Sequence, residues 1–186
     1  MRSLIQILCF LLALGLVACR KDSHPEEMPV NRTSSFVDEK QKTGQDNFSI
    51  QIGKTEEIAL LKDRALGLVG KGNYKTAKHV LDDVLELDRD LSLLMLRCML
   101  GERTGENGLY VQRCYQQVAE AYSEIDGEDP LNEINRVGAL LFARAPQAQL
   151  EAEKLMESLK GTELEDISLI LFKDFDREAY LSTILP

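Results

Sequence analysis

The stretch "GLVGKGNYKTAKHVLDDVLELD", Gly67 to Asp88, decides the fold, because it admits two incompatible interpretations. Gly70 and Lys71 inside a glycine-rich run are typical of a phosphate-binding loop. The sequence Gly72-Asn73-Tyr74, followed by alanine and leucine at helical spacing, is typical of the turn in a helical hairpin. The first interpretation predicts a nucleotide enzyme, and the second predicts a scaffold that binds another protein.

The phosphate-loop interpretation fails on three requirements. A loop of the type G-x-x-x-x-G-K-[ST] follows a strand and ends in a hydroxyl residue that binds magnesium. In this chain Ala65 stands five residues before Gly70, where the first glycine is needed, and Gly72 stands where the hydroxyl residue is needed. The preceding segment "TEEIALLKDRALGLV" has its apolar residues at helical spacing. The chain therefore lacks this nucleotide site.

The same residues support the hairpin interpretation. Gly72 and Asn73 tolerate the left-handed backbone of a tight turn. The helix that follows has one apolar face, made of Tyr74, Ala77, Leu81, Val84 and Leu85.

This pattern, over about Glu57 to Arg89, resembles a tetratricopeptide repeat. In that family a Gly-[DN]-Tyr turn precedes the second helix, and small residues, here Ala65 and Ala77, let the two helices approach closely. The chain departs from the family at Leu61, where an aromatic residue is common, and at Arg89, where a proline is common. The resemblance implies a stack of helical hairpins with a concave protein-binding surface.

From Thr55 onward, apolar residues recur at threes and fours between joints of glycine or proline. The spacing predicts helices at 55–70, 74–87, 90–101, 108–126, 130–144, 147–160 and 175–184. The run "ISLILF", 167–172, fits a helix or a strand, and the helices around it favour a helix.

We therefore expect an all-α domain at 55–186. Three antiparallel helical hairpins like tetratricopeptide repeats, closed by a tail, would form a short right-handed solenoid. The alternative is an irregular α-helical domain that carries one chance resemblance.

The amino terminus reads as an export signal. In "MRSLIQILCFLLALGLVAC", Arg2 precedes an apolar run from Leu4 to Val17 that is too short for a normal membrane span. The run closes on Leu16-Val17-Ala18-Cys19, which resembles the lipobox of bacterial lipoproteins. That resemblance implies a signal peptide at 1–18 and lipid on Cys19. An ordinary secretory signal with a chance cysteine is the alternative.

The residue after Cys19 is Arg20, not the aspartate that often retains such lipoproteins in the inner membrane. We expect a lipid-anchored protein on the periplasmic face of the outer membrane. Residues 19–54 are polar, lack helical periodicity and contain Pro25 and Pro29, which predicts a lipidated, disordered tether before the domain.

Two cysteines remain for the folded domain, since Cys9 lies in the signal. Cys98 and Cys114 fall on the two helices of the second predicted hairpin, in an oxidising compartment. A disulfide between them would close a loop of about 15 residues and stabilise by about 3 kcal/mol. Two buried free thiols are the alternative.

Residues suited to catalysis are few. His24 lies in the tether and His79 on a helix surface, and neither is placed beside a nucleophile. The acidic groups Asp82-Asp83 and Glu163/Glu165/Asp166 fit ordinary surface charge. We expect no enzymatic activity, no metal, and no cofactor besides the covalent lipid on Cys19. The net charge of −9 argues against nucleic acid as a partner.

The expected function is protein binding by the concave helical surface. The residues predicted to line it are Lys62, Leu66 and Val69 from the first hairpin with Asn135, Arg136 and Ala139 from the third. Leu66 and Val69 also fit ordinary core positions.

The leading hypothesis is a pilotin-like or assembly adaptor for a secretin, pilus or secretion component, since small helical-repeat lipoproteins include pilotin-type factors. The alternative is an immunity lipoprotein that neutralises a toxic effector in the periplasm.

Overall fold

The computed structural model describes residues 42–126 and 129–186, with side chains from residue 54 onward. Within these ranges the chain is all-helical, as predicted, and has no strand. The helices are α2 (Lys42–Gly70), α3 (Tyr74–Leu87), α4 (Leu91–Arg103), α5 (Gly108–Ser123), α6 (Pro130–Phe142), α7 (Ala148–Ser158), α8 (Glu165–Phe172) and α9 (Arg177–Ile184). The predicted signal peptide, Cys19 and the tether up to residue 41 lie outside the described residues.

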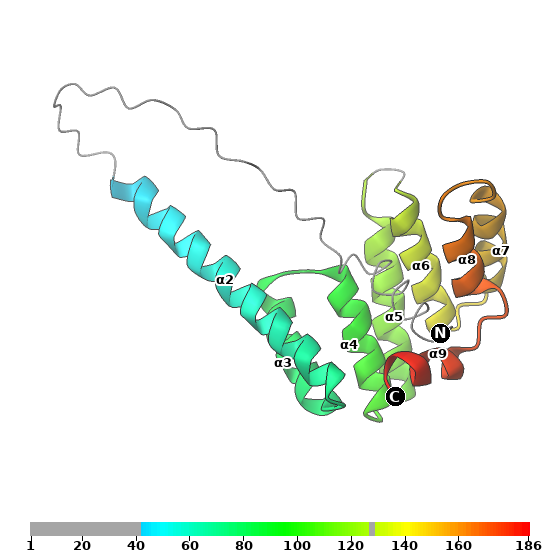
Figure 1. Ribbon diagram of the computed structural model, residues 1–186, viewed down its shortest axis with the longest axis horizontal. Coiled ribbons are helices and arrows are strands. Elements are labelled where there is room, and N and C mark those ends of the chain that lie inside the picture. The colour runs from blue at the N-terminus through cyan, green and yellow to red at the C-terminus, as the bar shows by residue number, and fades with distance from the viewer. Residues whose placement is uncertain (1–41, 127–128) are drawn as a thin grey trace, which may run out of the picture.

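Helices α2 to α8 stand in a row, and each of them packs mainly on its neighbours in the chain (Figure 1). The pair α2 and α3 forms one end of the row, and α7 and α8 form the other. Among the described residues, no helix has the length and apolar character that a membrane crossing needs.

The first helix is longer than predicted. It begins at Lys42, whereas the apolar spacing predicted a start at residue 55 and a tether up to residue 54. The sequence from Lys42 to Gly70 contains no proline, and an interior glycine costs a helix only about 1 kcal/mol. Apolar spacing marks where a helix packs against a core, so it misses a polar extension.

The turn between α2 and α3 forms at the quoted stretch. Gly72 has a φ of +71°, the left-handed conformation that favours glycine, whereas Asn73 has a φ of −82°. The amide of Gly72 donates to the carbonyl of Val69 over 2.9 Å, which terminates α2. Ala65 and Ala77 are fully buried, so the two predicted small residues lie in the core that α2 and α3 share.

Four later helices begin at a side-chain cap that accepts a hydrogen bond from the first turn. The caps are Asp90, Asn107, Asp129 and Asp176. The side chain of Asp90, for example, accepts hydrogen bonds from the backbone amides of Ser92 and Leu93. Each cap satisfies amides that have no partner inside the helix, and this fixes where the helix starts.

A disulfide joins α4 to α5. It links Cys98 to Cys114, whose Cα atoms are 5.7 Å apart, and both side chains are buried. The fully buried Tyr115 lies next to it and donates a hydrogen bond of 2.9 Å from its hydroxyl to Glu102.

Helix α9 closes the row from the side. The Phe142 ring of α6 contacts the Tyr180 ring of α9 with 5.5 Å between centroids, and Leu181 and Leu185 are buried. Arg177 pairs with Glu102 of α4 at 2.5 Å, and the Tyr74 hydroxyl of α3 donates to the Pro186 carbonyl. This short helix therefore ties α3, α4 and α6 together near the lower ends of α4 and α5 in Figure 1.

Candidate functional site

The predicted binding residues of the first hairpin are engaged within the fold. The Lys62 ammonium donates to Asp88 at 2.8 Å and to Asp90 at 3.0 Å. Burial opposes the charge of Lys62, but these two hydrogen bonds outweigh it and raise the pKa of Lys62. Leu66 and Val69 are half-buried and pack against the core. These three residues therefore belong to the packing of the fold.

Asn135 and Arg136 are neighbours in α6 but lie in different hollows. Successive helical residues point about 100° apart, because the helix has about 3.6 residues per turn. Asn135 lines a small aromatic hollow between α6, α8 and α9, whereas Arg136 lines a larger groove beside α7. The fully buried Ala139 lines neither hollow. The structure thus does not bring the predicted residues onto one surface.

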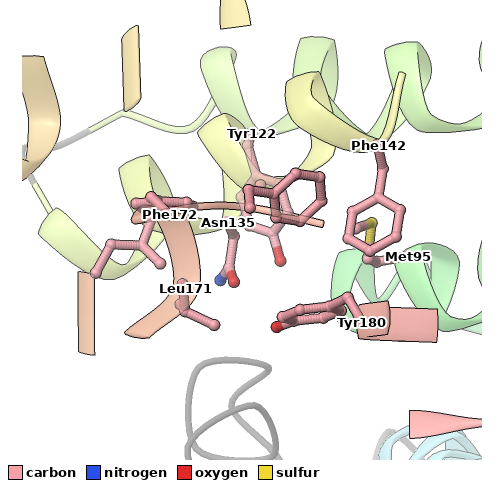
Figure 2. Close-up of a pocket in the computed structure, with 10 residues that line it drawn as sticks. Met95, Tyr122, Asn135, Phe142, Leu171, Phe172 and Tyr180 are labelled. Atoms are coloured by element: carbon pink, nitrogen blue, oxygen red, sulfur yellow. The ribbon is translucent and has the colours of Figure 1, made fainter. Parts of the chain in front are cut away.

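The aromatic hollow is too small to hold a protein segment. Figure 2 shows Tyr122, Asn135 and Tyr180 around it, and its volume is about 30 Å³. A space of this size holds one water molecule. Its walls include Ile134, Phe142 and Phe172, which are core residues at 1–2% exposure. The hollow is a packing gap between α9 and the helical row.

The groove is much larger and consists of two adjoining hollows of about 590 and 480 Å³. They share Glu133, Arg136, Leu155 and Ser158. Other lining residues are Tyr122, Ser123, Ile125, Asp129, Pro130, Asn132, Glu151, Lys154, Leu159 and Thr162. We call this set the α6–α7 groove; the end of α5 forms its third wall.

The floor of the groove is apolar, and apolar side chains also reach its edge. Leu155 and Leu159 are buried in the floor, whereas Ile125 is 41% exposed. Leu131, between the lining residues Pro130 and Asn132, is 37% exposed. Single exposed apolar residues are ordinary, but two of them beside a hollow with an apolar floor are typical of a binding surface.

Arg136 crosses the groove and holds two carboxylates. Its guanidinium donates two hydrogen bonds to Glu133, of 2.7 and 2.8 Å, and a third to Glu151 of α7. The hydrogen bonds from Arg136 lower the pKa of Glu133, although burial opposes this shift. The hydrogen bond to Glu133 is in turn the main cause of the raised pKa of Arg136. The pairing fixes α6 to α7 and neutralises Arg136, so this cation does not make the groove positive.

Titratable groups elsewhere form structural pairs. Asp82, part of one acidic pair noted in the sequence, accepts a hydrogen bond of 2.9 Å from Arg97. Among residues 54–126 and 129–186, no cluster of histidine, cysteine and carboxylate side chains is arranged to hold a metal ion. Among the described residues, the α6–α7 groove is thus the candidate binding site.

Sequence reasoning identified Arg136 but missed the rest of the groove. Tyr122, Leu155 and Leu159 look like ordinary core in a helical pattern; they are buried, but they also line the groove. One signal was available in the joint "SEIDGEDP", where Ile125 is a single apolar residue among carboxylates.

Comparisons with protein-family models, with curated proteins and with solved structures return no match to this chain.

Proposed function

We propose that this protein is a lipid-anchored periplasmic adaptor that binds a protein of an envelope machine, such as a secretin, pilus or secretion component, through the α6–α7 groove. The observation that carries the proposal is the groove itself, which combines an apolar floor with the exposed Ile125 at its edge. Exposed apolar side chains beside a hollow with an apolar floor are typical of protein-binding surfaces.

The anchor follows from the lipobox-like Leu16 to Cys19. Several acyl chains hold a protein stably on a membrane. Confinement to the membrane raises the effective concentration of the adaptor near a machine in the same membrane. The lipid therefore supplies location, and the groove supplies recognition.

The helical row supplies rigidity. The resemblance of 57–89 to a tetratricopeptide repeat supports a short right-handed solenoid, in which each hairpin rests on the next. In this proposal the lining residues come from α5, α6, α7 and the turns beside them, whereas in the family mostly first helices, of which α6 is the one here, line the concave face.

The test is a crosslinked pull-down of the full lipidated protein from its own envelope. We expect a secretin, pilus or secretion component with the wild-type protein and with Leu60→Ser, and loss of that component with Ile125→Ser. Leu60 is the matched control, because it is 70% exposed on α2 and lies outside the groove. Capture of a secreted toxin would support the immunity function in place of the adaptor function. If Ile125→Ser captures the same protein as the wild type, the groove is not the binding site for either function.

A further inference from the structure

We infer that the α6–α7 groove takes a short amphipathic helix of its partner, with Lys or Arg residues beside the apolar face of that helix. The inference rests on the proposed protein-binding function and adds the shape and charge of the bound segment. It follows from the length of the groove, from the helical walls whose backbone groups are already hydrogen-bonded, and from the charges at its rim.

The length of the groove suits two to three helical turns. Its lining residues on α7 run from Glu151 to Ser158, and the turn residues Leu159 and Thr162 continue it. At about 1.5 Å per residue, the helical part alone is about 11 Å long. A helix of this length presents apolar residues at i, i+3, i+4 and i+7, which could contact the lining residues Ile125 and Leu155.

The walls of the groove favour a helix over an extended strand. Helices α5, α6 and α7 form them, and backbone groups inside a helix are already hydrogen-bonded to one another. An extended segment would find no sheet edge here with which to pair. A helical segment satisfies its own backbone and needs only side-chain contacts.

The rim of the groove is acidic. Between Arg113 and Arg136 the sequence contains no lysine or arginine. Asp129 and Glu133 in this interval line the groove, and Glu124 and Asp126 flank the lining residue Ile125 in the sequence. Glu124, Asp126 and Asp129 are exposed, and all three are within four residues of Ile125 in the sequence.

These carboxylates lie at the end of the groove away from Lys154, and Arg136 is neutralised by Glu133 and Glu151. Opposite charges across an interface favour association, whereas like charges oppose it. Lysine or arginine flanking the apolar face of the partner helix would meet the rim. A second copy of this chain would bring the same carboxylates against it, so the charges disfavour self-association through the groove.

The experiment uses the full-length lipidated protein in phosphatidylcholine nanodiscs and two fluorescent 14-residue helical peptides. Both peptides carry leucine at i, i+3, i+4 and i+7, one with lysine and one with glutamate at the flanking positions. Anisotropy is measured against empty nanodiscs, at low and at high salt. We expect the lysine peptide to bind about tenfold more tightly than the glutamate peptide, with a preference that shrinks in high salt.

Variants locate the binding. Ile125→Ser is expected to weaken binding of the lysine peptide about tenfold, and Glu124→Gln with Asp126→Asn about threefold to tenfold. Leu60→Ser and Leu109→Ser are matched controls, since both leucines are about 70% exposed outside the groove, and binding should not change. Equal binding of both peptides overturns the inference, as does unchanged binding to Ile125→Ser. Self-association that Ile125→Ser abolishes would assign the groove to a second copy and also overturns it.

Failure of this inference can be told from failure of the proposed function. If an envelope component depends on Ile125 in the pull-down but contacts the groove with an acidic or extended segment, the adaptor function stands and the inference falls. If no component depends on Ile125, both fall.

Discussion

The carboxylate of Glu106 lies where α3, α4 and the loop before α5 meet. It accepts hydrogen bonds from Lys78 of α3 and from Arg97 of α4, the latter over 3.1 Å. Burial opposes the charge of Glu106, but the two cations outweigh it, so the pKa of Glu106 lies below its ordinary value. Glu106 therefore stabilises the fold only while it is ionised.

Glu106→Gln should weaken the fold in a pH-dependent way. Because the pKa of Glu106 is lower in the folded than in the unfolded chain, its contribution is complete above the ordinary glutamate pKa of about 4.3. The contribution is lost as the pH falls through the lower folded pKa. We expect the variant to lose about 1 kcal/mol of unfolding free energy at pH 7, and less at pH 3. Urea denaturation at several pH values measures both.

The control for this experiment is Glu120→Gln, which removes an exposed carboxylate. It should leave the unfolding free energy nearly unchanged at pH 7. A Glu106→Gln variant that loses as much stability at pH 3 as at pH 7 would show that the carboxylate acts by packing alone.

The Cys98–Cys114 disulfide joins α4 to α5 and is the only side-chain cross-link within residues 54–126 and 129–186. A loop of this size stabilises by about 3 kcal/mol on the chain-entropy view, because the link restricts the unfolded chain. We expect a thiol reductant to lower the Tm of the wild-type protein by several degrees. The double variant Cys98→Ala with Cys114→Ala should have a low Tm that the reductant does not change. A wild-type Tm indifferent to reductant would contradict the bridge.

Helix α9 should stabilise the whole row through its apolar contacts. Leu185, just after α9, is fully buried, and a buried leucine replaced by alanine costs about 2–5 kcal/mol. We expect Leu185→Ala to lower the unfolding free energy by that amount in urea denaturation. Leu169→Ala on α8 is the control, since Leu169 is 39% exposed and should cost little. If both substitutions lower the unfolding free energy by the same small amount, α9 does not pack on the helical row.

The positions of most helices could be predicted from the sequence. The apolar spacing and the turn at Gly72 placed α3 correctly from Tyr74 to Leu87, and the ambiguous run at 167–172 forms α8. The start of α2 was wrong by thirteen residues, from 55 back to Lys42, because residues 42–54 lack the helical apolar spacing on which the prediction rested.

The groove and the cysteines show a second limit of the sequence. Whether Cys98 and Cys114 are bridged or free depends on how far apart α4 and α5 hold them, and spacing along the chain does not give that distance. The groove arises where the ends of α5 and α7 diverge beside α6, so its residues come from three elements that no local pattern connects.

For the whole molecule, α2 lies at one end of the row and α7, which lines the groove, lies at the other (Figure 1). If lipid on Cys19 anchors the chain, the lipid supplies location and the groove is a separate, binding feature of the helical row. We expect Cys19→Ser to move the protein from the outer-membrane fraction of a density gradient to the soluble periplasmic fraction. Peptide binding by the groove should stay unchanged, since the lipid supplies location only. Retention of Cys19→Ser in the membrane fraction would contradict the lipid anchor.

The central claim is that the α6–α7 groove contacts a protein of an envelope machine. The most direct measurement places a photo-crosslinking amino acid at Ile125 in the full lipidated protein in living cells, with the same substitution at Leu60 as the control. Both positions are exposed, but only Ile125 lines the groove. We expect one dominant crosslink from position 125 to a secretin, pilus or secretion component. The same crosslink should not form from position 60. Crosslinks that are the same from both positions, or a crosslink from position 125 to a secreted toxin, would contradict it.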